Sequence, residues 1–129
     1  MTYLLDANVL IALVMPDHPH HDRAAGWAAD MTDFALCPVV EGALVRLVLR
    51  MGSSVAEAQE LLRLVRGRQG FAWWPDDLSY ADADLAHVRG HRQATDGYLA
   101  ALAHQHGGLL ATLDEPLAQA RPDVVLLLP

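Results

Sequence analysis

The sequence predicts an α/β fold in which helices cover both faces of a mostly parallel sheet of four to five strands. Short apolar runs of strand length alternate with longer segments in which apolar residues recur at helical spacing. No repeat, low-complexity tract or linker interrupts the 129 residues, of which 53% are hydrophobic. One domain with a substantial core is therefore expected over residues 1–129.

The first half of the chain alternates strand and helix signals. The apolar run Tyr3 to Leu5 is interpreted as a buried first strand, and residues 7–14 as a helix that ends near Pro16. A polar, histidine-rich loop then leads into a second helix that reaches about Met31. Residues 34–37 are the second strand candidate, which gives the order strand, helix, helix, strand.

Two consecutive helices are expected in the middle of the chain. After Pro38, which is tolerated in a first helical turn, apolar residues recur at helical spacing until Gly52. Ser54 followed by Glu57 matches a capping box, so the next helix is expected over residues 55–66. These two helices should form a hairpin.

The last part of the chain returns to alternation. Residues 71–74 are interpreted as a third strand and residues 79–88 as a short helix. Thr95 is a candidate N-cap for a helix that Gly107 and Gly108 end. The remaining expected elements are a fourth strand over 109–113, a short helix over 115–120 and a final apolar run over 124–128.

The charge pattern leaves two interpretations open. A net charge of −7 argues against a nucleic-acid partner, but all nine cations of the chain are arginines, and five of them fall between Arg46 and Arg68. The planar guanidinium suits phosphate oxygens and stacks on bases. The same arginines could equally be the solvated faces of two helices.

The chain carries no signal for export or membrane insertion. No basic leader precedes the first strand, and no apolar run is long enough to span a bilayer. Cys37 is the single cysteine, so it can form neither an intramolecular disulfide nor a cysteine zinc cluster. A reducing cytoplasm is expected.

Four carboxylates are expected at one edge of the sheet. In an open parallel sheet, ligands bind beyond the carboxyl ends of the strands, where the following helices begin. Asp6 and Asp114 directly follow apolar strands, and Glu41 and Asp96 lie in first helical turns. The helix dipole explains an acid in a first turn, but not a carboxylate at the end of a buried strand with no lysine or adjacent arginine beside it. A divalent cation, Mg²⁺ or Mn²⁺, is therefore the expected partner.

The segments around these acids resemble one known family. Asp6-Ala7-Asn8, Cys37 to Glu41 with Arg46 following, Thr95 to Ala100, and Ala111 to Asp114 resemble the PIN-domain ribonucleases in order and along the whole chain. Within that family, the chain is similar to VapC-type toxins of bacterial toxin–antitoxin pairs. The resemblance implies a three-layer PIN fold and a metal-dependent endoribonuclease that cuts structured RNA such as tRNA or rRNA.

The resemblance also implies roles and partners. Asp6 and Asp96 would be primary metal ligands, Glu41 would complete the site, and Asp114 would act through water or a second ion. The residues that would orient the carboxylates and bound water are Asn8 and Thr112. A homodimer is implied, and so is an antitoxin that lays an amphipathic segment on apolar helical surface. That surface is expected at Leu61, Leu62 and Val65 or on the first two helices.

RNA contacts are expected near the acids. The candidates are Arg46, Arg89, His91 and Arg92. Trp73 and Trp74 could stack on bases, although their place in an apolar strand favours a core position for at least one of them. A zinc site among the seven histidines is a weaker alternative, because Gly90 separates His87 from His91 and the loop histidines should be solvated.

Two other functions fit parts of the pattern. An aspartyl-phosphate phosphatase also uses an aspartate at a strand end, but it holds the phosphoryl group with a lysine, and this chain has none. A catalytically silent PIN domain that binds other proteins is the alternative from a different class. The full set of four acids favours the nuclease.

Overall fold

The computed structural model describes residues 1–129 and contains one parallel sheet of five strands in the order β3-β2-β1-β4-β5. This confirms the predicted α/β class. The strands are β1 (Thr2–Leu5), β2 (Asp33–Leu36), β3 (Phe71–Trp73), β4 (Leu109–Thr112) and β5 (Val125–Leu127). The helices are α1 (Ala7–Val14), α2 (His21–Ala29), α3 (Pro38–Arg50), α4 (Val55–Arg66), α5 (Ala94–Gln105) and α6 (Glu115–Ala120), with a short 3₁₀ turn, η1 (His91–Gln93), before α5.

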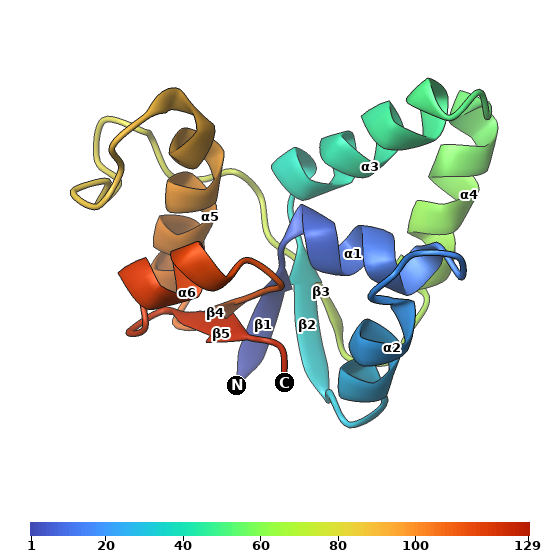
Figure 1. The fold of residues 1–129 in the computed structure, drawn as a ribbon, viewed down its shortest axis with the longest axis horizontal. Coiled ribbons are helices and arrows are strands. Elements are labelled where there is room, and N and C mark those ends of the chain that lie inside the picture. Colours follow the sequence, from blue (N-terminus) through green and yellow to red (C-terminus); the bar gives the residue numbers. More distant parts are fainter.

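The strand order places a topological switch between β1 and β4. From β1 the chain builds outward through β2 to β3, and it then returns through α5 to β4 on the other side of β1. Figure 1 shows α1 to α4 grouped on one side of the sheet and α5 with α6 on the other. Leu5 is paired with Ala111, so the carboxyl ends of the two central strands lie side by side. Ligands of open α/β sheets bind at such a switch.

The core lies on both faces of the sheet. Leu4 and Leu5 are consecutive residues of β1, point to opposite faces, and are both fully buried. Helix α5 is buried along the whole stretch from Gly97 to Ala103, because the sheet covers one side of it and the segment of residues 74–90 packs on another. No helix of the structure combines the length and the apolar character that a membrane span requires.

The predicted start of the helix that carries Asp96 was wrong by two residues. Helix α5 begins at Ala94, its N-cap is Gln93, and no side chain caps it. The reason is that η1 runs directly into α5, so the chain is already helical when it reaches Thr95. Asp96 does lie in the first turn, as predicted.

The predicted helix over residues 79–88 was also wrong, since this segment forms only turns and bends. Side chains here bond to nearby backbone N–H groups: Ser79 Oγ accepts from Ala81 N at 3.1 Å, and Asp84 Oδ1 accepts from Ala86 N at 3.2 Å. Such local bonds compete with the helical pattern. The capping box further upstream was predicted correctly.

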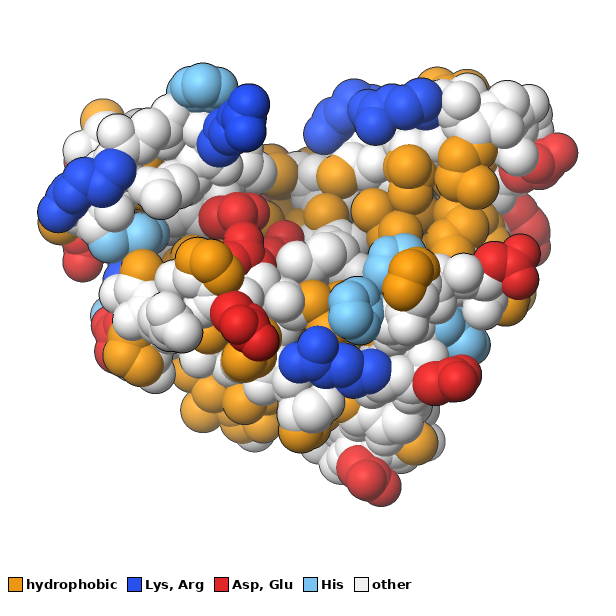
Figure 2. Space-filling view, in the orientation of Figure 1, with side chains coloured by type: hydrophobic (Ala, Val, Ile, Leu, Met, Phe, Trp, Pro, Cys, Tyr) orange, Lys and Arg blue, Asp and Glu red, His pale blue; other side chains and the backbone are white.

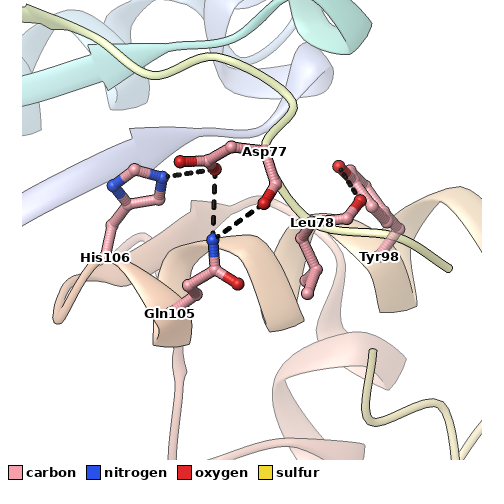
Figure 3. A network of polar contacts seen from close by, with 5 residues as sticks. All are labelled: Asp77, Leu78, Tyr98, Gln105 and His106. Carbon is pink, nitrogen blue, oxygen red and sulfur yellow. Dashed lines mark hydrogen bonds and ion pairs between the residues drawn. The ribbon is translucent and has the colours of Figure 1, made fainter. Parts of the chain in front are cut away.

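The irregular segment is nevertheless tied to α5 (Figure 3). Asp77 Oδ1 lies 2.9 Å from His106 Nε2 and accepts from Gln105 Nε2 at 3.1 Å, both at the end of α5. Near the middle of that helix, the Tyr98 hydroxyl donates to the Leu78 carbonyl at 2.9 Å. These contacts fix residues 77–78 against α5. Residues 85–88, later in the same segment, then lie beside Gly97 in the first turns of the helix.

Candidate active site

Asp6 is the most buried acid of the molecule, with 4% of its surface exposed. It lies at the junction of β1 and α1, where its extended backbone makes it the N-cap of the helix. Oδ1 accepts from Ala7 N and Oδ2 accepts from the Thr112 hydroxyl, both at 2.7 Å. Burial raises the pKa of Asp6 above its usual value, these two hydrogen bonds lower it, and the charge of Asp114 raises it further. The net direction is upward, as expected of a buried carboxylate without a cation.

The Thr112 hydroxyl connects three parts of the site. It donates to Asp6, and it accepts from Asn8 Nδ2 at 3.2 Å and from Asp114 N at 3.1 Å. Asn8 in turn accepts from Leu113 N through Oδ1 at 3.2 Å. Asn8 and Thr112 therefore join α1 to β4 across the sheet switch, which is more than the capping of a local turn.

The other two aspartates lie beside Asp6. Asp114 is the N-cap of α6, and its Oδ1 accepts from Leu117 N at 3.1 Å. Burial raises the pKa of Asp96 to about 6, and the charges of Asp6 and Asp114 add to the rise. The structure thus brings three carboxylates from three elements into one electrostatically coupled cluster, which we call the aspartate cluster.

Glu41 differs from the three aspartates in its electrostatic surroundings. It occupies the first turn of α3, as predicted, but burial raises its pKa and Arg66 of α4 lowers it, with no contribution from the three aspartates. Glu41 lines a pocket of about 180 Å³ together with Gln59, Leu62, Arg63 and Arg66 of α4. Its place in the metal site remains a prediction.

The aspartate cluster suits a hydrated divalent cation by its chemistry. Its donors are all carboxylate oxygens, and none of the three aspartates forms an ion pair with an arginine or histidine. No three acidic, histidine or cysteine side chains stand close enough together to hold one ion directly. Mg²⁺ is usually held by one or two protein carboxylates and keeps several waters, so this spacing fits Mg²⁺ or the similar Mn²⁺.

Basic side chains flank the acidic hollow. Figure 2 shows acidic side chains within a hollow between two lobes, with arginine side chains on the rims of both lobes. Arg46, His91 and Arg92 are exposed. Arg89 is exposed as well, and its guanidinium also donates to the Ala86 carbonyl at 2.7 Å. All four candidate RNA contacts are therefore accessible from solvent.

The two tryptophans have different environments. Trp74 is 8% exposed and stacks on His106 at 4.4 Å between ring centroids, so the prediction that at least one tryptophan lies in the core is confirmed. Trp73 is 43% exposed, and the Arg66 guanidinium lies 5.7 Å from its ring centroid. The Trp73 ring is therefore a partly exposed aromatic surface beside α4.

Sequence reasoning missed one residue of the site. His87 was considered only as a zinc ligand, yet it lines a small pocket of about 70 Å³ together with Gln93, Asp96 and Asp114. Both of its ring nitrogens are buried and have no hydrogen-bond partner. No spacing pattern marks it, because the segment that carries it has no regular secondary structure.

Gly97 makes room for that segment. A Cβ at this position would lie 2.7 Å from Val88 Cγ2, 3.2 Å from Leu85 Cδ2 and 3.3 Å from His87 Nε2. A glycine-to-alanine change inside a helix normally stabilises by about 1 kcal/mol. Here overpacking, which costs about 1–3 kcal/mol, should outweigh that gain.

We therefore expect Gly97→Ala to lower the free energy of unfolding by roughly 1 kcal/mol, measured by urea denaturation. The matched control is Gly26→Ala in α2, where a Cβ meets nothing within 4 Å. That variant should be as stable as the unaltered chain or more stable. Equal stabilisation by both changes would contradict the close packing described at Gly97.

The fold and the aspartate cluster define a class: an α/β protein whose sheet switch carries coupled carboxylates, as in metal-dependent enzymes that act on phosphate esters. The PIN domain family matches residues 3–121. The chain is 52% identical over 130 residues to Ribonuclease VapC29 of Mycobacterium tuberculosis, which covers 100% of this chain and 98% of the relative. It is 38% identical to Ribonuclease VapC39 of the same species, over 93% of this chain and 94% of the relative. The chain belongs to the PIN domain family.

Solved structures share the fold. VapBC2 from Rickettsia felis, bound to a DNA fragment from its promoter, matches with a TM-score of 0.70 and 13% identity and covers 100% of both chains. FitAcB from Neisseria gonorrhoeae matches with a TM-score of 0.61 and 24% identity, over 98% of this chain and 96% of that one. At these identities, the likeness establishes the fold alone.

Proposed function

We propose that residues 1–129 act as one PIN domain, a metal-dependent endoribonuclease that is the toxin of a toxin–antitoxin pair. The observation that carries this proposal is the aspartate cluster, which concentrates negative charge at the sheet switch without a protein cation. The two relatives, which match 100% and 93% of this chain, are named ribonucleases. Structured RNA such as tRNA or rRNA in the cytoplasm is the proposed substrate, and loss of translation the proposed consequence.

Asp6 and Asp96 would hold the Mg²⁺ or Mn²⁺, with Glu41 and Asp114 acting through water or after side-chain rotation. When bound, the ion supplies Lewis acidity, which makes water a stronger nucleophile and offsets the charge of the phosphodiester. The chain itself orients the carboxylates. Thr112 and Ala7 N hold the two oxygens of Asp6, so this carboxylate is in position before any ion arrives.

The exposed cations of the rim would position the RNA. Arg46, Arg89, His91 and Arg92 would contact phosphates, and such contacts give affinity without base specificity. Trp73 offers a ring on which a base could stack. Attack by water requires no ribose 2′-hydroxyl, so we expect products with 5′-phosphate and 3′-hydroxyl ends.

The test is cleavage by the purified chain with Mg²⁺ and with EDTA, together with sequencing of new 5′-phosphate ends in cells after brief induction. Cleavage that requires the metal, and that an Asp6→Asn chain lacks, supports the proposal. A chain that binds partner proteins but cuts no RNA in either setting would instead be the silent interaction module.

A proposed antitoxin would dock on apolar surface beside α1. Of the predicted surface at Leu61, Leu62 and Val65, Val65 is 6% exposed and offers little area, and the two leucines are half-buried against the domain's core. An open groove of about 310 Å³ instead lies between the end of α1 and α3. Its apolar lining residues are Ile11, Met15, Pro16, Leu47 and Met51.

An amphipathic antitoxin helix would fill this groove, and a nearby arginine could bind the aspartate cluster in competition with the metal. We also propose a homodimer in which the aspartate clusters of the two chains share one longer groove. Replacing Met51, 63% exposed, by aspartate should weaken antitoxin affinity at least tenfold in calorimetry while leaving RNA cleavage unchanged. Unchanged affinity would exclude this groove, and light scattering at about 14 kDa would exclude the dimer.

A further inference from the structure

His87 is a half-buried residue whose imidazole nitrogens lack hydrogen-bond partners. Both ring nitrogens are inaccessible to solvent, and neither has a partner. Leaving a buried polar group unpaired costs about 1–3 kcal/mol, so such a group in a folded protein calls for an explanation. An ordered water or a bound ligand is the usual one.

The position of the ring is well defined. The segment that carries His87 is tied to α5 by the bonds of Asp77 and Leu78, and Arg121 Nη1 reaches the Asp84 carbonyl at 3.5 Å. The absence of a side chain at Gly97 lets His87 Nε2 approach the first turn of α5, next to Asp96. The imidazole is thus packed against the helix that carries a carboxylate of the aspartate cluster.

His87 shares its pocket with three further polar side chains. Gln93, Asp96 and Asp114 line it together with small apolar groups of α6. The Gln93 amide oxygen already accepts from Arg89 N at 2.6 Å, so its NH₂ group remains available as a donor. No N–H or O–H of the chain donates to Asp96, and Asp114 receives one bond, from Leu117 N. The pocket therefore contains both donors and acceptors that the protein itself leaves unused.

The size of the pocket decides what can occupy it. A volume of about 70 Å³ is far below that of pockets for bases or other small-molecule ligands, roughly 300 Å³ or more. A water takes about 30 Å³ in the liquid, so one or two waters fit. A metal held directly by His87 and both aspartates does not match the structure, in which no such group of three stands close enough.

We propose that this pocket is a hydration site in which His87 and Gln93 hold ordered water against the carboxylates of Asp96 and Asp114. His87 is then a positioning residue: it acts through water on two carboxylates of the aspartate cluster and sets how tightly they bind the divalent ion. The inference rests on the proposed function, since it concerns the same site.

The test measures Mn²⁺ affinity by electron paramagnetic resonance, without RNA. His87→Leu removes both ring nitrogens at similar size and should weaken Mn²⁺ binding about 10- to 100-fold, as is typical when a partner of a metal ligand is lost. The metal-free variant should retain most of the stability of the unaltered chain, because leucine fills a similar volume. His87→Gln retains a donor and an acceptor and should restore the affinity to within about threefold.

The matched control is His104→Leu, the same substitution at an exposed position of α5, which should leave Mn²⁺ affinity unchanged. Unchanged affinity in His87→Leu would overturn the inference while leaving the ribonuclease proposal intact. Equal losses in the leucine and glutamine variants, together with lower stability, would overturn it in favour of a packing role. If the unaltered chain binds no Mn²⁺ and cuts no RNA, the proposed function fails and the inference fails with it.

Discussion

Asp6→Asn will abolish metal-dependent RNA cleavage, with an expected loss of about a thousandfold or more, comparable with removing a main electrostatic group of an active site. Asp6 is the carboxylate whose two oxygens are both oriented by the chain, through Ala7 N and the Thr112 hydroxyl. Asparagine has nearly the same shape but no charge, so it removes the attraction for a divalent cation, and its NH₂ group replaces one of the two accepting oxygens.

The same substitution should not damage the fold. The net effect of the surroundings raises the pKa of Asp6, which means that the folded chain disfavours its charged form. Without metal, Asp6→Asn should therefore unfold at the same temperature as the unaltered chain or a few degrees higher.

Calorimetry with EDTA measures the stability, and a labelled RNA assay measures cleavage. Asp30→Asn, at an exposed end of α2, is the control for loss of one negative charge and should retain full activity. Near-normal cleavage by the Asp6→Asn chain at saturating Mg²⁺ would exclude Asp6 as a metal ligand.

Affinity for the divalent ion should fall steeply below pH 6. The pKa of Asp96 is raised to about 6, first by burial and then by the charges of Asp6 and Asp114. Metal binding requires the ionised carboxylate, so protons compete with the ion, and the apparent affinity should drop by about tenfold per pH unit below this value. Cleavage at limiting Mg²⁺ should follow the same curve, and excess metal should shift it to lower pH.

The stability of the metal-free chain should change in the opposite sense. The folded pKa of Asp96, about 6, lies above its ordinary value of 3.8, so the folded state binds the proton more tightly than the unfolded state does. Ionised Asp96 therefore costs stability above pH 6, and this cost is relieved as the pH falls from 7 through 6 toward 4.

Melting temperatures in EDTA between pH 7 and 5, compared with those of Asp96→Asn, isolate this contribution from the histidines that titrate in the same range. The difference between the two chains should shrink as the pH falls, since protonated aspartate and asparagine are both neutral. A difference that is independent of pH would contradict the raised pKa of Asp96.

Local sequence patterns were sufficient to predict most of the fold. The alternation of apolar strand-length runs with helical spacing predicted four strands and the final apolar run that forms β5, and their order apart from the helix expected over residues 79–88. The Ser54 capping box is present, with Ser54 Oγ accepting from Glu57 N at 3.1 Å. The carboxyl ends of parallel strands necessarily meet at one edge of a sheet, so Asp6 and Asp114 could be placed together from sequence alone. These features depend on residues close in the chain or on a general rule of topology.

The segment before α5 could not be predicted in the same way. Its apolar residues suggested a helix, but the bonds of Ser79 and Asp84 to nearby N–H groups and the long-range ties of Asp77 to the end of α5 favour turns. The sequence contains Ser79 and Asp84, but which backbone N–H groups their side chains bond to depends on how the segment packs. For the same reason, the position of His87 beside Asp96 could not be predicted from the sequence.

The sequence by itself determined the α/β class, the family and the edge of the sheet at which the acids lie, because periodicity, strand ends and short motifs are properties of neighbouring residues. Only the tertiary structure decided that three aspartates are coupled, that the charge of Arg66 acts on Glu41, and that the ring nitrogens of His87 are buried in a pocket that Asp96 also lines. The physical reason is that burial, charge coupling and hydrogen-bond satisfaction depend on groups far apart in the chain, and these meet only when the sheet and its helices have packed.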